Sequence, residues 1–246
     1  MKLPKPRTVV LLVCSIILFF TVASVAGQTW RLTGHSSHRR LVRQFALDDE
    51  WNVPSAYQAL SLGICALLLF EIARRSHQLR RGSLAHWIIL GAIFVLLACD
   101  EAFRIHERLG KYREDLPGGM GHVFKTGWVI FGLAFVAVVG LSYIRFLFRL
   151  PRRYAILFVI AGAIYVGGAV GMEIAASPLV ESRGRDNYTY VLMSTLEEVM
   201  EMAGICIFLY ALTSYLHQMV GKFTSPDTRS ASYTSREPQS PPTPAT

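Results

Sequence analysis

Charged residues are scarce in this sequence, and the patterns of most familiar catalytic sites are missing. Only 17% of the 246 residues are charged, whereas 52% are hydrophobic. The chain has no G-x-S-x-G nucleophile elbow, no P-loop, no G-x-G-x-x-G, no H-E-x-x-H and no EF-hand loop. Its four cysteines show no C-x-x-C spacing, which favours small buried apolar residues over a redox or metal role. These absences argue against an average soluble domain and against the common catalytic classes.

The sequence does contain apolar runs that are long enough to cross a membrane. A bilayer core requires about 20 mostly apolar residues per helix. Six segments meet this requirement: residues 8–27, 54–72, 87–106, 124–147, 154–176 and 190–216. The first run exceeds the hydrophobic region of a signal peptide, so we expect it to be retained. We therefore predict an all-α fold, a polytopic membrane helix bundle of six transmembrane helices over residues 1–221, followed by a disordered Ser/Thr/Pro-rich tail over residues 222–246.

The basic residues indicate how the bundle meets the membrane. The net charge of +8 comes largely from arginines that flank the predicted helices, as anionic lipid headgroups favour. We therefore expect the lipid bilayer, and no nucleic acid, as a partner. Lys and Arg are slightly more numerous on the side of the N-terminus, which predicts that both termini lie in the cytoplasm. We expect the membrane to be the bacterial cytoplasmic membrane.

Two features of the apolar helices concern how they pack. GAIFVLLA at residues 91–98 resembles GAIYVGGA at residues 162–169, an offset of about 71 residues that three parallel helical-hairpin repeats would produce. Chance similarity between apolar helices is the alternative. Gly167 and Gly171, with Gly168 beside them, form a small-xxx-small pattern, which predicts close packing against a neighbouring helix.

Ionisable side chains gather at one predicted level, the extracytoplasmic ends of the helices. Charges at membrane depth are costly, so they usually face the interior of the bundle and are paired. Asp48, Asp49 and Glu50 precede the second segment on this side. The remaining members of the acidic level are Asp100, Glu101, His106, Glu107, His122, Glu173, Glu197, Glu198 and Glu201.

The sixth segment gives the sharpest geometry. At 100° per residue, Ser194, Glu197, Glu198 and Glu201 lie within an arc of about 100° on one helix face. Three carboxylates at this spacing repel each other. A bound cation, bound protons or neighbouring arginines must therefore neutralise them.

The favoured interpretation is a polar pocket that binds a divalent metal ion, either Zn²⁺ through imidazole and carboxylate or Mn²⁺, Ca²⁺ or Mg²⁺ through carboxylates. If the protein is an enzyme, the metal would act on a lipid-like substrate within the membrane. The expected ligands are Glu197, Glu198, Glu201, Asp100, Glu101, His106 and Glu173, and the outer partners are Glu107, His122, Arg104 and Ser194.

Two other functions use the same residues. In a proton- or cation-coupled transporter, the carboxylates would alternate between a protonated and a cation-bound form. In a structural or partner-docking protein, the carboxylates would instead be locked in a salt-bridge network by nearby basic residues, namely Arg104, Arg108, Lys125, Arg183 and Arg185.

The stretch LACDEAFRIHE, residues 97–107, resembles a helix end with a DEA…HE pattern in uncharacterised bacterial multipass membrane proteins. The resemblance is confined to these residues and brings no activity with it. It implies that Asp100, Glu101, His106 and Glu107 belong together. Alkaline ceramidase-like membrane hydrolases differ, because they have seven helices and a paired His-x-x-x-His near the C-terminus that this chain lacks.

Overall fold

The computed structural model describes residues 4–34, 38–49, 51–78, 83–103, 105 and 127–224, and every regular element in these ranges is a helix. Six stretches are long and apolar enough to cross a membrane, so the prediction of an all-α bundle with six such helices is confirmed. Their bounds are Pro6–Leu32, Val53–Gln78, Leu84–Phe103, Phe131–Arg149, Arg152–Arg183 and Tyr188–Val220. The three-hairpin repeat stays a prediction.

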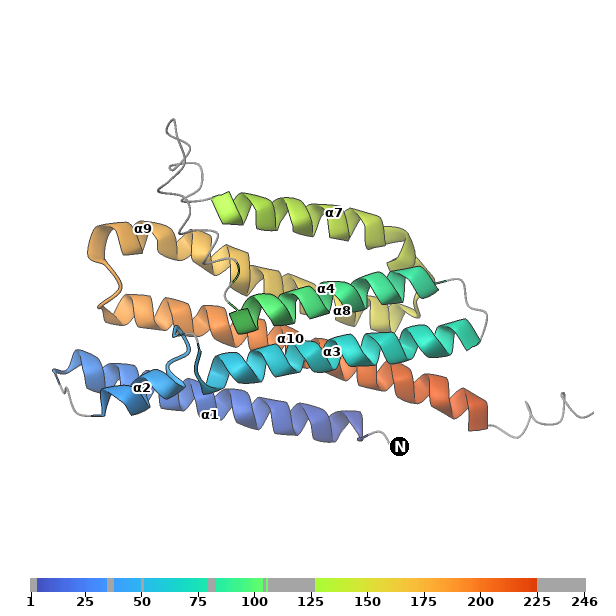
Figure 1. The fold of residues 1–246 in the computed structure, drawn as a ribbon, viewed down its shortest axis with the longest axis horizontal. Coiled ribbons are helices and arrows are strands. Elements are labelled where there is room, and N and C mark those ends of the chain that lie inside the picture. The colour runs from blue at the N-terminus through green and yellow to red at the C-terminus, as the bar shows by residue number, and fades with distance from the viewer. Residues whose placement is uncertain are drawn as a thin grey trace, which may run out of the picture.

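Helix α10, Tyr188–Thr224, is the central element of the bundle (Figure 1). It packs against α1 (Pro6–Leu32), α3 (Val53–Gln78), α8 (Arg152–Val166) and the π-helical turn η2 (Gly167–Met172). Its 37 residues exceed the roughly 20 that a bilayer core requires. The helix ends at Thr224, three residues into the tail that the sequence predicted from residue 222. Residues 225–246 lie outside the described ranges.

The other helices surround this centre. Helices α3 and α4 (Leu84–Phe103) form a hairpin, and the short α2 (Arg39–Phe45) lies between α1 and α3 in the chain. Helix α9 (Glu173–Arg183) continues α8 beyond η2, and α7 (Gly127–Arg149) lies along one edge of the bundle (Figure 1). Most of the α7 side chains are exposed, and Leu141 and Phe148 are 71% and 87% exposed. Apolar side chains on such an outer face suit contact with lipid.

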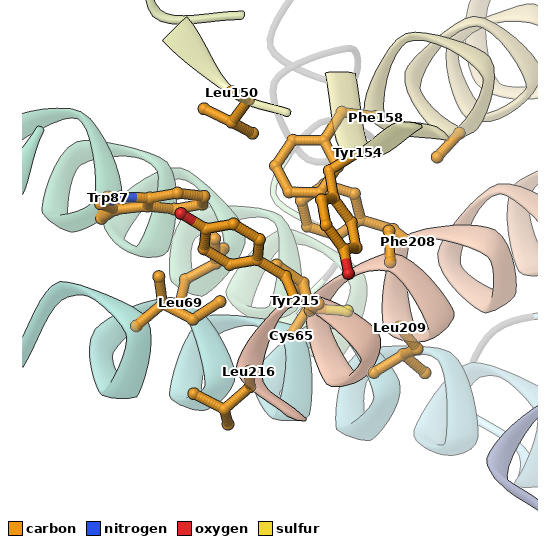
Figure 2. Packing of buried hydrophobic residues seen from close by; sticks show 14 of the residues in the cluster. Cys65, Leu69, Trp87, Leu150, Tyr154, Phe158, Phe208, Leu209, Tyr215 and Leu216 are labelled. Carbon is orange, nitrogen blue, oxygen red and sulfur yellow. The ribbon is translucent and has the colours of Figure 1, made fainter. Parts of the chain in front are cut away.

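One end of the bundle is filled by aromatic side chains (Figure 2). Trp87 on α4 is 1% exposed and packs its ring against Phe146 of α7, Phe158 of α8 and Tyr215 of α10, with centroid distances of 4.8, 6.1 and 5.4 Å. We call this the aromatic end. It contains the last turns of α3 and α10 and the first turn of α4. The predicted acidic level lies at the opposite end.

The close helix contacts differ from those predicted. A Cβ atom on Gly171 would meet nothing within 4 Å, whereas one on Gly168 would lie 2.8 Å from the carbonyl oxygen of Glu197. Gly204 on α10 makes the reciprocal approach to α8, where its Cβ would lie 2.8 Å from the carbonyl oxygen of Ala161. The small-residue contact between α8–η2 and α10 is therefore formed by Gly168 and Gly204, and the prediction was wrong for Gly171.

The cysteines are only partly buried. Cys65 and Cys206 are buried as expected, Cys99 is half-buried, and Cys14 is exposed, which corrects the prediction for Cys14. The Sγ atoms of Cys14 on α1 and Cys206 on α10 are 4.0 Å apart. This distance is about twice the length of a disulfide bond, so both residues are free thiols.

Candidate functional site

The acidic face of α10 points into the bundle. Glu201 is 9% exposed, and its Oε2 accepts a hydrogen bond of 2.7 Å from Nε2 of Gln58 on α3. Gln58 is itself 2% exposed. Glu198, one helical turn earlier, and Glu197 are half-buried. The face predicted from the sequence spacing therefore meets α3, and a buried amide holds its deepest carboxylate.

Helix α4 brings further carboxylates to this face. Trp87, Gly91 and Phe94 mark its inward side, and the ring of Phe94 stacks on Phe208 of α10 at 4.7 Å. Continuing this helical spacing places Glu101 on the same side. The negative charge of Glu101 acts on both Glu198 and Glu201, and that of Asp100 acts on Glu201. We call Asp100, Glu101, Glu197, Glu198 and Glu201 the acidic cluster.

The ion pairs found in the described ranges lie away from the centre of this cluster. They join Arg31 to Asp186, Arg43 to Asp49, and both Arg74 and Arg75 to Glu71. Arg185, one of the basic residues named in the structural alternative, lies over the ring of Tyr190. Three others of that set, Arg104, Arg108 and Lys125, lie outside the described residues. Within the described residues, neither Glu198 nor Glu201 forms an ion pair with a basic side chain.

Helix α8 and η2 form the opposite wall. The charges of Glu101, Glu198 and Glu201 all act on Tyr165 of α8, which places its phenol near the cluster. Gly168 follows in the π-helical turn and allows the backbone to approach α10 beside Glu197 and Glu201. A single π-helical turn within an α-helix is frequently found at functional sites. The turn occurs here at the level of the acidic cluster.

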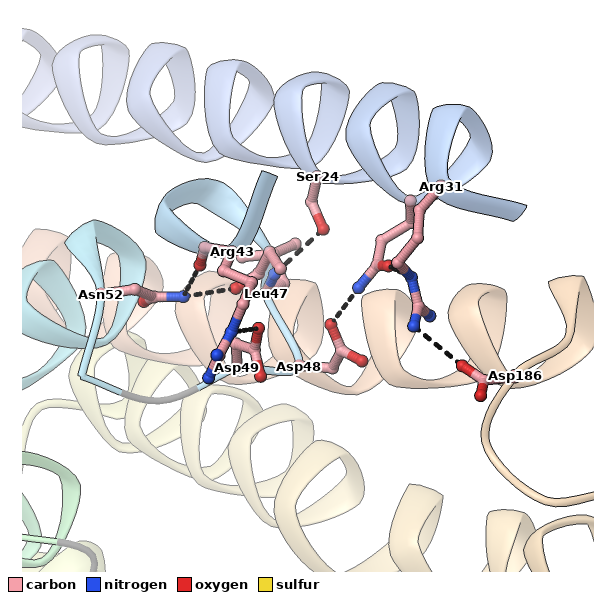
Figure 3. A network of polar contacts seen from close by, with 10 residues as sticks. Ser24, Arg31, Arg43, Leu47, Asp48, Asp49, Asn52 and Asp186 are labelled. Atoms are coloured by element: carbon pink, nitrogen blue, oxygen red, sulfur yellow. Dashed lines mark hydrogen bonds and ion pairs between the residues drawn. The ribbon is translucent and has the colours of Figure 1, made fainter. Parts of the chain in front are cut away.

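A polar network connects the C-terminal part of α1 to neighbouring loops of the bundle (Figure 3). Gln28 on α1 donates from Nε2 to Oδ1 of Asp48 at 2.6 Å and accepts from Nε of Arg31, which also pairs with Asp186 at 2.8 Å. The loop that carries Asp48 is fixed because the backbone N–H of Leu47 donates to Oγ of Ser24 at 3.0 Å. This network joins α1 to the α2–α3 and α9–α10 connections.

Asp48 links this network electrostatically to the acidic cluster. Its charge acts on Glu198. Burial raises the pKa of Asp48 above its ordinary value of 3.8, and repulsion by Asp49 adds to this effect. The hydrogen bond from Gln28 and the positive charge of Arg31 oppose the rise but do not cancel it.

The remaining predicted residues occupy different positions. The hydroxyl of Ser194 donates to the carbonyl of Val191 in its own helix. Glu173 begins α9 and is half-buried, and its charge acts on Tyr190 together with that of Glu197. The other four predicted site residues lie outside the described residues, namely Arg104, His106, Glu107 and His122.

Among the described residues, no group of three or more His, Cys, Asp or Glu side chains is arranged to hold a metal ion. Of the predicted ligands, the structure brings together the five carboxylates of the acidic cluster. Sequence analysis missed Gln58, Tyr165 and Gln28. Gln58 could have been identified from its position, because a strongly polar side chain inside an apolar segment is costly unless it is paired, which predicts a buried polar partner.

The comparisons with known proteins identify a family but no activity. A family model described as "Domain of unknown function (DUF8692)" matches residues 13–216, a range that includes the acidic cluster and all or part of each membrane-spanning stretch. No curated protein and no solved structure matches the chain.

Proposed function

We propose a cation-binding function for this chain, which belongs to the family described as Domain of unknown function (DUF8692). The acidic cluster binds a divalent metal ion at the end of the bundle opposite the aromatic end. Glu198 and Glu201 are the central ligands; the charges of Asp100, Glu101 and Glu197 act on them, but the described residues do not by themselves complete a ligand set. His106, Glu107 and His122 are the further ligands that the sequence predicts, and they lie outside the described residues.

The observation that carries this proposal is the pair Glu198 and Glu201. Both lie within a membrane-spanning stretch, both are repelled by Glu101, and within the described residues neither has a basic partner. A charge at such depth costs a few kcal/mol on insertion scales unless it is compensated. A divalent cation compensates two carboxylates at once, and hard cations prefer carboxylate oxygens.

The aromatic end favours a one-sided site over a transporter. A transported ion must cross the whole bundle, but this end is filled by Trp87, Phe146, Phe158 and Tyr215. Those side chains offer an ion few polar groups to replace its water. Ion binding from one side, with or without catalysis, therefore agrees better with the packing.

The finer proposal is a metal-dependent reaction on a lipid-like substrate. A bound divalent cation would polarise a substrate oxygen or activate water. The phenol of Tyr165, near the cluster, is a hydrogen-bond donor for a substrate oxygen. We propose a lipid-like substrate because the acidic cluster lies in membrane-spanning stretches. A molecule dissolved in the bilayer can reach such a site directly from the lipid.

Thermal unfolding of the detergent-purified protein tests cation binding. We expect Mn²⁺, Zn²⁺, Ca²⁺ or Mg²⁺ to stabilise the wild type, by about 2.7 kcal/mol at 100 times the dissociation constant. The variant Glu198→Gln/Glu201→Gln lacks the central charges, so it should be more stable than the wild type without cation and should gain nothing when cation is added. Glu181→Gln, at an exposed carboxylate on α9, is the control and should respond as the wild type does. A cation effect that is equal in all three proteins would contradict the proposal.

We also propose that the protein resides in the bacterial cytoplasmic membrane with both termini in the cytoplasm, which places the acidic cluster on the extracytoplasmic side. Reporter fusions test this orientation. A fluorescent reporter that matures only in the cytoplasm should be bright at the C-terminus and dark when inserted at Gly184, between α9 and α10. The reverse result would invert the proposed orientation and leave the cation site unaffected.

A further inference from the structure

An open cavity on the outer surface, beside the aromatic end, has a different chemistry from the acidic cluster. Its volume is about 500 Å³, and it lies between the last turns of α3 and the first turns of α4. Phe70, Leu84 and Ile88 form apolar walls, and Arg74, His77 and Gln78 place polar groups at its edge. Arg74 is 16 residues along α3 from Gln58, so the cavity is about 24 Å from the acidic cluster along the helix axis.

The cavity opens to the outer surface of the bundle. Phe70 and Ile88 are 37% and 44% exposed. The ring of Phe70 lies directly over Gly91 of α4, where a Cβ atom would come within 2.6 Å of the ring. The absence of a side chain at Gly91 therefore lets the ring of Phe70 approach the α4 backbone closely. The resulting apolar wall belongs to two helices that span the membrane.

The polar edge carries a net positive charge. Nε and Nη2 of Arg74 donate to the two carboxylate oxygens of Glu71, both at 2.7 Å, and Arg75 donates to the same carboxylate. Two guanidinium groups against one carboxylate leave one positive charge. A guanidinium has five N–H donors, and the side chain of Arg74 is 56% exposed, so further donors of Arg74 are accessible from outside.

We propose that this cavity binds a phospholipid with an anionic headgroup. One acyl chain occupies the apolar cavity, and the phosphate accepts hydrogen bonds from Arg74 with His77 beside it. Charge complementarity selects the anionic lipid over a zwitterionic one. Position supports the same occupant, because the end of a membrane-spanning helix is where headgroups lie. Free phosphate does not fit this description, since the apolar walls would offer it nothing.

Native mass spectrometry of the detergent-purified full chain tests the proposal. The probes are phosphatidylglycerol and phosphatidylcholine with identical acyl chains. We expect phosphatidylglycerol to bind about fivefold more tightly, which corresponds to the roughly 1 kcal/mol that one basic residue contributes near anionic lipid. Arg74→Gln should abolish this preference. Arg152→Gln is the matched control, because it removes an equal charge from an exposed residue at the start of α8 that neither lines the cavity nor contacts Glu71.

A second pair of variants tests the apolar walls. Ile88→Trp narrows the cavity at its apolar wall and should weaken the binding of both lipids at least fivefold. Ile89→Trp adds the same bulk to an exposed neighbour outside the cavity and should leave binding unchanged. The proposal is overturned if the wild type binds both lipids equally, if Arg152→Gln acts like Arg74→Gln, if both tryptophan variants bind lipid equally, or if millimolar inorganic phosphate displaces the lipid.

Discussion

At the scale of single residues, Gln58 is a residue whose pairing with the acidic face the sequence alone could not identify. The spacing of Glu197, Glu198 and Glu201 was sufficient to predict one acidic helix face. The partner of that face could not be predicted, because Gln58 and Glu201 are 143 residues apart and their hydrogen bond depends on how α3 packs on α10. Asp48 was placed on the correct side, but its contact with Gln28 also arises from packing.

Gln58→Leu removes the amide and keeps a similar volume. The buried Glu201 then loses its hydrogen bond, which should lower the free energy of unfolding by about 1–3 kcal/mol. Denaturant unfolding in detergent measures this change. Gln44→Leu, at an exposed residue of α2, should change the free energy by less than about 0.5 kcal/mol. Equal effects of the two substitutions would show that Gln58 does not support the acidic cluster.

Asp48→Asn should make stability less dependent on pH. Because the folded-state pKa of Asp48 is raised above the ordinary value of 3.8, the folded protein holds this proton more tightly than the unfolded chain does. Stability conferred by Asp48 is therefore greatest at low pH and falls as the pH rises from about 4 through the raised pKa. The substituted amide keeps an acceptor for Gln28 and has no charge to bury. Melting temperatures between pH 3 and 8 should show the variant gaining on the wild type as the pH rises, and a difference that is constant or that shrinks would refute this assignment.

At the scale of helices, the sequence predicted six spans and their approximate ends but misplaced one contact. The small-residue pattern was read with α-helical spacing, which pairs Gly167 with Gly171. Residues 167–172 form a π-helical turn instead, in which hydrogen bonds join residues five apart. Gly168 is seven residues after Ala161, which faces Gly204 of α10, whereas Gly171 lies within the turn and meets nothing within 4 Å. The letters alone did not indicate which of the neighbouring glycines faces α10.

Gly168→Ala and Gly171→Ala form a matched pair that tests this contact. The new methyl group at residue 168 would lie 2.8 Å from the carbonyl oxygen of Glu197, so α8 and α10 must separate, at a cost of about 1–3 kcal/mol. At residue 171 the methyl group meets nothing within 4 Å, and replacing a helical glycine should be neutral or stabilising by up to about 1 kcal/mol. Unfolding in detergent measures both variants. Equal destabilisation by both would place the contact elsewhere.

At the scale of the whole molecule, the two ends of the bundle have different roles. The aromatic end, built around Trp87, supplies apolar packing, whereas the opposite end gathers carboxylates that repel each other, of which Glu201 is buried and the others are half-buried. Hydropathy and charge in the sequence were sufficient to predict this separation of apolar and acidic levels. The sequence could not show that the aromatic end is closed, because that depends on ring contacts between α4, α7, α8 and α10.

The metal content of the purified protein tests the central claim most directly. Elemental mass spectrometry should find close to one equivalent of a divalent metal in the wild type after extensive dialysis without chelator. The folded variant Glu198→Gln/Glu201→Gln should contain almost none, whereas Glu181→Gln should retain the wild-type amount. A wild type that carries no metal and binds none on reconstitution, or a variant that retains the wild-type amount, would contradict cation binding by the acidic cluster.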